Sequence, residues 1–537
     1  MFVLNSCDKA HWNTFAGSDG TLWMWGRAYA DSGALSIEKI YGVIAEALEQ
    51  DCLKEVLEGI RGFFALAFET ENLEIAAVDH VRSRPLFYGI CDGHLIVSDT
   101  AQQVRAGVES EELDRQGLEE LRLTLYVTGA RTLAEGVRQL NGGEFLVWKK
   151  GAPSAKVQSH FQLRHTEPEK CDASVLAGRL RGAFRASIHR MLEYADGRQI
   201  MLPLSGGVDS RLIAVGLREA GYDNVQAYCF GQPRHLDVQI SQQVAEELGF
   251  AWVYVAYSRD EWHKSWFGDE RMAYQRYGSQ LTSAPGYADW LAVRKLRADG
   301  VAEDDCVFAP GHTGDFIAGG HIPGIAFVKD SFTRAALAEQ IFAHHYNCSP
   351  VEAASPRDVD WWHDYIVSQL QCEEQMDASG FADEYERWEW KERQCKYIVN
   401  NVRCYEFFGA DWWLPLWDRE FVGVWQDVPL SMRRRRLWGL GVFEDLVRGV
   451  SPGVGSIRLA EKRKGILRRI GHRARKYLPR QIRDELMFQE RIKLARSQPI
   501  CAVERYDPEE VRRLTRLGYS INGIVLHHHM EELGLWT

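Results

Sequence analysis

The feature that most constrains this chain is a glycine-bearing turn between two apolar stretches. The turn consists of Ser205, Gly206, Gly207, Val208, Asp209 and Ser210. Residues 199–204 form an apolar run typical of a buried strand, and residues 211–220 have helical periodicity. Further predicted strands at 225–230 and 252–256 enclose a predicted helix at 237–248. This alternation predicts a parallel sheet with right-handed crossovers, whose ligands bind beyond the carboxyl ends of its strands.

The residue types of the turn suit a bound pyrophosphate. Two glycines let the backbone bend tightly and approach a ligand with no Cβ in the way. The amides that open the following helix favour an anion, and the serine hydroxyls add donors. Asp209 supplies a hard oxygen ligand of the kind that Mg²⁺ prefers. The alternative is a Gly/Ser turn that happens to carry an aspartate, but its position between strand and helix favours the phosphate site.

Two regions of different character lie on either side of a charged, Pro-containing stretch at residues 164–170. Residues 1–165 carry short alternating or apolar runs bounded by Gly, Asp and Asn, which predict a sheet-rich domain with a few helices. Residues 172–537 begin with an amphipathic helix, contain the strand–helix alternation and continue with helical periodicity. We therefore expect two domains, at 1–165 and 172–537.

Composition excludes several classes of protein. Of 537 residues, 45% are hydrophobic and 26% charged, which is ordinary globular composition. The 64 Lys and Arg against 75 Asp and Glu give a net charge of −11, which disfavours a general nucleic-acid binder. The 11 cysteines form no CxxC pair, and no apolar run approaches roughly 18 residues. Because no secretory leader is visible either, we expect a soluble cytoplasmic protein with no membrane partner.

The turn resembles the PP-loop of the N-type ATP pyrophosphatases. Further segments match the asparagine synthetases and β-lactam synthetases in order: residues 230–233 with Asp237, residues 283–287, residues 308–315 and residues 409–420. The resemblance covers about residues 172–470. It implies an enzyme that cleaves ATP between the α and β phosphates, activates a substrate carboxylate as an acyl-adenylate and forms an amide with a nitrogen nucleophile.

The resemblance also assigns residues to the predicted site. Ser205, Gly206, Gly207 and Ser210 match the pyrophosphate cradle, and Asp209 and Asp315 match the Mg²⁺ ligands. Phe230 and Gly231 fall where the family contacts adenine through its backbone, and Gly311 belongs to a second Gly-rich turn. The expected cofactors are ATP and Mg²⁺.

Three further residues are candidates for catalysis. His312 stands where the family commonly places Glu or Tyr, and a histidine with an ordinary pKa of about 6.5 suits a general base for an amine. Lys464, followed by Gly465, fits the lysine on a closing loop in β-lactam-forming relatives, with Lys462 as the runner-up. The alternatives are a loop histidine bonded to backbone and a solvated run of basic residues.

The first region resembles the family's Ntn-type glutaminase domain but departs from it at the nucleophile. Residues 59–67, 79–88 and 132–145 match that domain. A working glutaminase needs an N-terminal cysteine, whereas position 2 is Phe2, and Cys7 would serve only after an unusual cleavage. The glutamine-binding turn is replaced by Trp25, Gly26 and Arg27. We therefore expect a degenerate glutaminase-like domain without activity.

Together these features predict an α+β Ntn-hydrolase-like sandwich followed by an α/β PP-loop synthetase domain with a helical C-terminal part. The expected function is an ATP-dependent, AMP-forming ligase joining a small-molecule carboxylate to ammonia or an amine, in O-antigen sugar (uronamide) or secondary-metabolite biosynthesis. The alternatives are an intramolecular amide cyclase of the β-lactam synthetase type, a PP-loop tRNA-modifying enzyme and a non-catalytic binding protein. The oligomeric state, a homodimer included, stays open.

Overall fold

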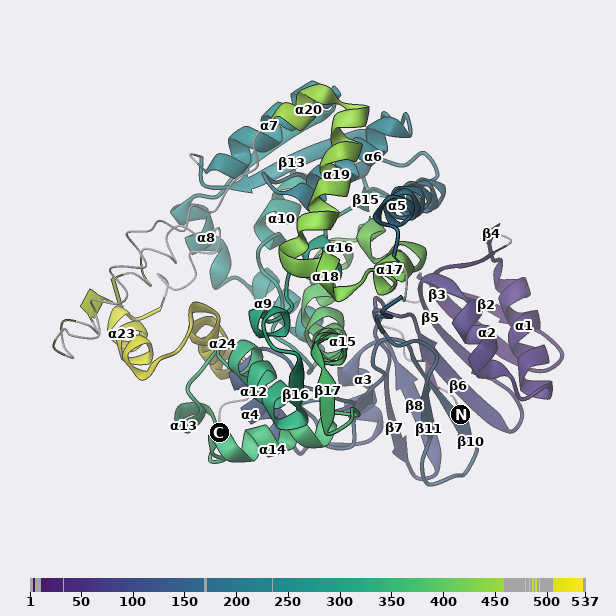
Figure 1. Ribbon diagram of the computed structural model, residues 1–537. Coiled ribbons are helices and arrows are strands. Elements are labelled where there is room, and N and C mark those ends of the chain that lie inside the picture. The colour runs from purple at the N-terminus through teal and green to yellow at the C-terminus, as the bar shows by residue number, and fades with distance from the viewer. Residues whose placement is uncertain are drawn as a thin grey trace.

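The computed structural model describes residues 3–4, 11–31, 33–168, 171–233, 235–457 and 506–534, together with a few positions between 479 and 492. Within these ranges the chain forms a strand-rich N-terminal part and a larger part built around a parallel sheet (Figure 1). No helix among the described residues is both long and apolar enough to cross a bilayer.

The N-terminal part is a pair of stacked sheets. One sheet has the strand order β1-β8-β7-β9 and the other β11-β10-β6-β5-β3-β2, with β4 paired to β3. Their strands are β1 (Val3–Leu4), β2 (Trp12–Ala16), β3 (Thr21–Ala30), β4 (Gly33–Ala34), β5 (Arg61–Glu69), β6 (Leu73–Val78), β7 (Phe87–Cys91), β8 (His94–Ser98), β9 (Arg138–Gln139), β10 (Glu144–Lys149) and β11 (Lys156–Ser159).

Alternating residues of the larger sheet build two different cores. On β5, Ala65 and Ala67 face the smaller sheet, whereas Phe64 and Phe68 pack against the outer helices. This follows from the period of two along a strand. Those outer helices are α1 (Ile37–Glu49) and α2 (Leu53–Gly59), while α3 (Ala101–Gly107) and α4 (Arg115–Thr124) belong to the cluster around the smaller sheet. Figure 1 shows α1 and α2 on the outer side of the larger sheet, so the layers run helix, sheet, sheet, helix.

The second part is organised by a five-stranded parallel sheet with the order β14-β13-β12-β15-β18. Its strands are β12 (Ile200–Pro203), β13 (Val225–Gly231), β14 (Ala251–Ala256), β15 (Val307–Phe308) and β18 (Asp411–Trp412). From β12 the chain adds β13 and β14 on one side, and then returns to add β15 and β18 on the other. The order therefore reverses between β12 and β15, which is where ligands bind in sheets of this kind.

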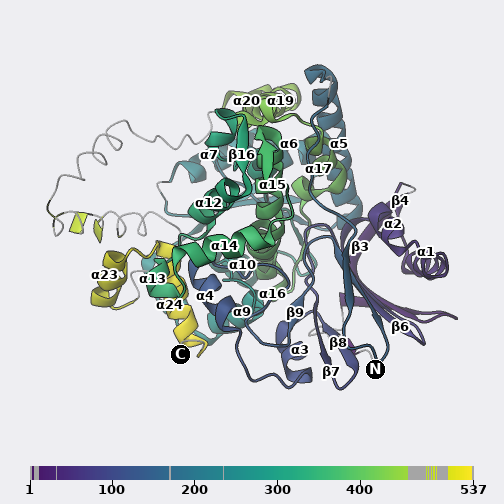
Figure 2. The same ribbon diagram turned by 60° about the horizontal axis from the view of Figure 1, so that its bottom comes forward.

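Helices cover this sheet on both faces. The connections β12 to β13 and β13 to β14 run in one direction and place α6 (Val208–Glu219) and α7 (Leu236–Leu248) on one face. The long helix α5 (Ala173–Ala195) packs against α6, and α17 (Arg419–Gln426) packs against α5. Toward the other face lie α8 (Arg259–Trp266), α9 (Asp269–Ser279), α10 (Trp290–Ala298) and α16 (Arg403–Phe407). Figure 2 shows α5, α6 and α17 together at the upper right.

The remaining elements of the described chain are mostly helices. They are α11 (Gly314–Ile317), η2 (Gly324–Phe327), β16 (Ser331–Thr333), α12 (Arg334–His345), α13 (Val351–Ala354), α14 (Val359–Gln369), β17 (Gln375–Asp377), α15 (Ala378–Glu389), η3 (Trp390–Ile398), η4 (Val399–Val402), η5 (Pro415–Trp417), α18 (Leu430–Arg433), η6 (Arg434–Arg436), α19 (Leu437–Val450), α20 (Pro452–Ser456), α23 (Pro508–Leu517) and α24 (Ile521–Glu532). The segment η3 is π-helical and continues α15 without a break.

Candidate active site

A cavity of about 380 Å³ opens at the carboxyl ends of β12 and β13. Its walls come from the turn after β12, the end of β13, the start of α7 and the turn after β15. The lining residues are Pro203, Leu204, Ser205, Gly207, Asp209, Ser210, Tyr228, Cys229, Phe230, Gly231, Gln232, His235, Asp237, Asp289, Pro310, Gly311 and His312. The cavity therefore lies at the reversal of strand order, where the turn chemistry predicts a phosphate site.

The first turn is held in shape by its own serines. The Ser205 amide donates to the Ser210 hydroxyl at 3.1 Å, and the Gly207 amide donates to the Ser205 hydroxyl at 3.2 Å. Gly207 is the N-cap of α6 and has no side chain with which to cap the helix. The first amides of this 12-residue helix therefore face the cavity uncapped. Helix N-termini of this kind attract anions.

The second turn packs directly against the first. Strands β12 and β15 are neighbours, with Met201 paired to Phe308, so both turns leave the sheet at the same edge. A Cβ on Gly311 would lie 3.1 Å from the Ser210 amide nitrogen, and one on Gly314 would lie 2.7 Å from Oδ1 of Asp209. A side chain at Gly314 would therefore displace the Asp209 carboxylate, and one at Gly311 would press against the first turn.

The two predicted metal ligands share this junction. The pKa of Asp209 is raised by burial and, to a smaller extent, by the nearby carboxylate of Asp315. Nη2 of Arg436 lies 2.7 Å from Oδ1 of Asp209, and its positive charge lowers the pKa of Asp209. The same charge also lowers the pKa of Asp315. The guanidinium of Arg436 therefore offsets part of the repulsion between the two neighbouring carboxylates.

Asp315 has a second cationic partner in His321. Burial opposes ionisation of Asp315, yet the hydrogen bond to Nε2 of His321 at 3.2 Å and the charge of that ring lower its pKa to about 2. Burial likewise opposes the charge on His321, but hydrogen bonds to Asp315 and Glu389 raise its pKa to about 9. His321 is therefore a cation at neutral pH, held between one acid at the site and one buried behind it.

His312 lies in the cavity wall with one nitrogen unused. Its Nδ1 is buried and finds no hydrogen-bond partner among the described residues, while Thr313 beside it accepts from the Trp417 indole at 2.9 Å. Burial lowers the pKa of His312 to about 4. The ring is therefore neutral at pH 7, but it is a weaker base than the ordinary histidine that the sequence suggested, since a base works best with a pKa near the working pH. Its catalytic role stays a prediction.

The donor set fits Mg²⁺ bound together with a nucleotide. Within the described ranges no three His, Cys, Asp or Glu side chains converge to hold a metal by themselves. Mg²⁺ usually binds through one or two carboxylates plus substrate phosphates, which is what Asp209 and Asp315 at a phosphate-binding turn offer. Asp315 is 44% exposed, so its carboxylate remains accessible from the solvent side.

Comparison with protein families decides the relationship. Residues 179–486, more than half of the chain, match the family model described as asparagine synthase. The chain belongs to the asparagine synthase family. Residues 41–160 match the model of a glutamine amidotransferase domain. The expected architecture is thus confirmed as an Ntn-type domain followed by a PP-loop domain, and membership makes this an ATP-dependent carbon–nitrogen ligase.

No curated protein matches this asparagine synthase family chain. Solved structures that resemble it include glutamine phosphoribosylpyrophosphate amidotransferase from B. subtilis complexed with ADP and GMP, at 13% identity and a TM-score of 0.20 over 46% of this chain and 73% of that one. An allosteric regulatory enzyme of purine biosynthesis has 13% identity and a TM-score of 0.19 over 64% and 60%. NMN synthetase from Francisella tularensis has 14% identity and a TM-score of 0.20 over 41% and 94%.

Most of the predicted site residues of this family member meet at one cavity. Ser205, Gly207, Asp209, Ser210, Phe230, Gly231, Gly311 and His312 line it. Gly206 and Asp315 lie beside it, because the Gly206 amide donates to Asp237 at 3.2 Å and Asp315 contacts Asp209. Lys462 and Lys464 lie outside the described residues, as do Phe2 and Cys7. The roles of all these residues stay predictions.

Sequence reasoning missed two cations at this site. Arg436 is the last of four consecutive arginines, residues 433–436, and nothing in that run distinguishes it. Only the folded backbone distinguishes this part of the run. Arg435 and Arg436 have φ of 52° and 63°, in the left-handed region that non-glycine residues rarely adopt. His321 follows a Gly-Gly pair after Asp315, and no sequence period indicates that it turns back toward that acid.

The turn at residues 25–27 packs against side chains from both parts of the chain. The guanidinium of Arg84 lies over the rings of Trp25 and Trp412, at 4.4 and 4.7 Å, and its Nη1 contacts Glu406 at 3.1 Å. Gly26 has φ of 99°, and a Cβ there would lie 2.8 Å from Nε of Arg84. Space beside this turn is therefore taken up by a buried contact between the two parts.

Proposed function

We propose that this protein adenylates a small-molecule carboxylate with ATP and transfers the acyl group to ammonia or an amine. The observation that carries the proposal is the convergence of Asp209 and Asp315 at two mutually packed turns beside the uncapped N-terminus of α6. The same cavity extends along β13 to Phe230 and Gly231, where the rest of the nucleotide would lie.

Each turn has a defined part in this proposal. The substrate carboxylate attacks the α-phosphorus, the bond to the bridging oxygen breaks, and pyrophosphate leaves into the amides and hydroxyls of residues 205–210. Mg²⁺, held by Asp209 and Asp315, would supply positive charge to that leaving group. Arg436 moves from Asp209 to the phosphate oxygens when the nucleotide binds, since an arginine fork matches phosphate as well as carboxylate.

Amide formation then needs a base. The nitrogen nucleophile attacks the acyl carbon, AMP leaves, and the nitrogen loses a proton. His312 lines the cavity where the related enzymes place Glu or Tyr, and it is the candidate to accept that proton. Lys464, or Lys462, stabilises the developing negative charge from a closing loop, by resemblance to the β-lactam-forming relatives.

We further propose that the nitrogen does not come from glutamine hydrolysed by this chain. Phe2 stands where the resemblance requires a cysteine nucleophile, and Arg84 fills the space beside the altered Trp25–Arg27 turn. The nitrogen is then free ammonia, an amine of a second substrate, or an amine of the same molecule. O-antigen uronamide or secondary-metabolite synthesis is the pathway class that this chemistry serves.

The direct test is pyrophosphate exchange into ATP with Mg²⁺ and panels of carboxylates, followed by amide formation with panels of amines. We expect exchange with a particular carboxylate and no amine, and no glutamate release from glutamine. Exchange that depends on RNA would favour the tRNA-modifying alternative, and absence of exchange with every carboxylate would favour a binding protein. Glutamate release that disappears in Cys7→Ala would show that the N-terminus is a working glutaminase.

Arg436 gives a second prediction. Arg436→Met should lower the rate of pyrophosphate release by about 10²-fold, because a single charged donor to a developing oxyanion has an effect of this size. Steady-state pyrophosphate release with saturating ATP measures it. The exposed neighbour Arg435 is the control, and Arg435→Met should stay within about twofold of wild type. Equal losses in the two variants would contradict a specific role for Arg436.

A further inference from the structure

A buried ion pair on the π-helical segment η3 lies at the boundary between the two parts of the chain. Lys396 is fully buried and Glu392 nearly so, and the two side chains contact one another one turn apart. Burial lowers the pKa of Lys396, and the carboxylate of Glu392 opposes that shift. Two charges removed from water in this way require further hydrogen bonds to be tolerated.

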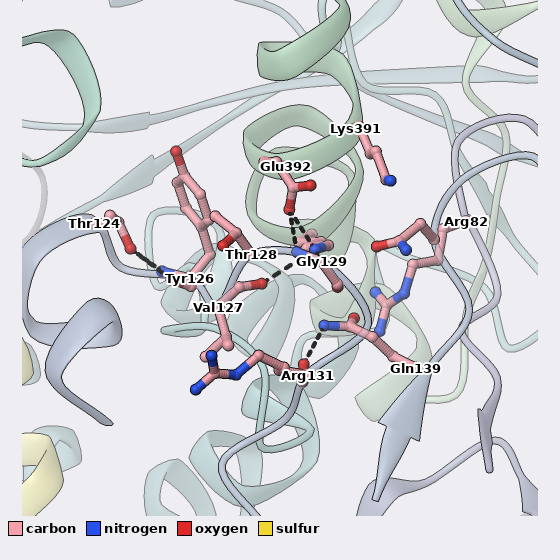
Figure 3. Close-up of polar contacts among 12 residues, drawn as sticks. Arg82, Thr124, Tyr126, Val127, Thr128, Gly129, Arg131, Gln139, Lys391 and Glu392 are labelled. Carbon is pink, nitrogen blue, oxygen red and sulfur yellow. Dashed lines mark hydrogen bonds and ion pairs between the residues drawn. The ribbon is translucent and has the colours of Figure 1, made fainter. Parts of the chain in front are cut away.

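Those further bonds come from a loop of the N-terminal part. Nζ of Lys396 donates to the carbonyl of Val127 at 3.1 Å and to that of Gly129 at 2.7 Å. In the opposite direction, the Gly129 amide donates to Oε2 of Glu392 at 2.9 Å. Figure 3 shows the loop passing directly beneath this face of η3, with Gly129 against Glu392. Residues 126–129, here called the clamp loop, therefore grip both members of the ion pair.

The clamp loop is itself anchored. Buried Glu120 of α4 accepts from the Thr128 amide at 3.0 Å and from the Thr128 hydroxyl at 2.7 Å. Tyr346 also donates to Glu120, at 2.7 Å, and the Tyr365 hydroxyl lies 2.9 Å from that of Thr128. The loop is thus a fixed support for η3.

Glu389, the last residue of α15 and the N-cap of η3, reaches the candidate active site. Oε1 of Glu389 accepts from Nη1 of Arg393 at 2.9 Å and from Nε2 of Gln394 at 3.1 Å. The second contact spans five residues, the spacing that a π-helix brings into line. Glu389 also contacts Nδ1 of His321, whose other nitrogen contacts Asp315. The rotation of η3 about its helix axis therefore sets the position of the Glu389 carboxylate.

We propose that the clamp loop of the N-terminal part is a positioning element of the ligase site. By holding Lys396 and Glu392 it fixes the register of η3, so that Glu389 orients His321 and, through it, the carboxylate of Asp315. This gives the glutaminase-like domain a task that does not require glutaminase chemistry. This inference rests on the proposed function in one respect, namely that Asp315 binds a metal ion.

The test removes the clamp without leaving a buried unpaired charge. Glu392→Gln/Lys396→Met neutralises both members, and replacing a buried pair by neutral side chains of similar size usually leaves stability nearly unchanged. The matched control is Asp114→Asn/Arg131→Met, which neutralises a pair 2.7 Å apart just past the clamp loop. Asp114 is the N-cap of α4, and asparagine is an equally good N-cap, so the control keeps that helix start.

Amide hydrogen exchange of the full chain without ligands is the first readout. We expect peptides covering 389–398 and 314–322 both to exchange about tenfold faster in the clamp variant, and neither to change in the control. Faster exchange in 389–398 alone, or in neither, would overturn the proposal, because coupling to the loop of Asp315 would be missing.

The second readout is the Mg²⁺ concentration that half-saturates pyrophosphate exchange. We expect it to rise about tenfold in the clamp variant at unchanged melting temperature, and to stay constant in the control. An unchanged Mg²⁺ requirement in an active clamp variant would overturn the proposal. If wild type shows no exchange at all, the proposed function fails instead, and hydrogen exchange still decides whether the clamp loop positions residues 314–322.

Discussion

Asp315→Asn should lower pyrophosphate release by about 10³-fold while leaving the fold intact. The substitution removes a charged oxygen where the account places Mg²⁺, and loss of a preorganised charge interaction at such a site has effects of this order. Folding should be unaffected because Asp315 is 44% exposed and asparagine retains an acceptor for His321. Initial-rate measurements with saturating Mg²⁺ and ATP, alongside circular dichroism, measure both properties.

The control for this variant is Asp330→Asn, a neutralised acid at an exposed position in the same region of the chain. It should keep wild-type pyrophosphate release within about twofold. Activity of Asp315→Asn within tenfold of wild type would show that this carboxylate is not needed for the chemistry. A matching loss of secondary structure would show that the role of Asp315 is structural.

Arg433→Met should destabilise the synthetase domain by about 3–5 kcal/mol, because it leaves the buried carboxylate of Glu386 without its ionic partner. Arg433 and Glu386 are both almost completely buried and in direct contact. Arg433 also packs against the turn that follows Asp315, since a Cβ on Gly319 would lie 2.7 Å from the Cβ of Arg433. Thermal unfolding followed by circular dichroism, at several protein concentrations, measures the loss.

Arg434→Met is the matched comparison, because Arg434 is the exposed next residue in the same run. It should change the free energy of unfolding by no more than about 0.5 kcal/mol. Similar melting temperatures for the two variants would contradict a structural ion pair at Arg433. The comparison also separates two positions within one arginine run, since Arg436 contacts Asp209 whereas Arg433 is buried against Glu386.

Much of the fold was predictable because it depends on local patterns. Alternation of apolar strands and amphipathic helices after residue 172 predicted the parallel sheet, and β12, α6, β13, α7 and β14 occur where that pattern placed them. The close packing of the second turn, at Gly311 and Gly314, against the first turn is an observation that the sequence alone did not give.

What the sequence did not predict depends on long-range packing. His321 reaches Glu389, 68 residues away, and Arg436 reaches Asp209, 227 residues away. No period in the sequence encodes such pairs. The π-helical register of η3 is likewise invisible to a 3.6-residue pattern, because it is recognised only when Gln394 comes into line with Glu389. The sequence around Lys396 is typical of a surface lysine, whereas in the fold Lys396 is the centre of a contact between two domains.

The central claim is that two glycine-bearing turns on neighbouring strands jointly hold one metal-bound ATP molecule. A crystal structure with Mn²⁺ and α,β-methylene-ATP tests it most directly, because the methylene bridge blocks the bond that the proposal breaks and manganese is located by its anomalous scattering. The account predicts one manganese peak at about 2.1–2.2 Å from carboxylate oxygens of both Asp209 and Asp315, with the β-phosphate against the amides of residues 205–208. A nucleotide bound elsewhere, or a metal that touches neither aspartate, would contradict it.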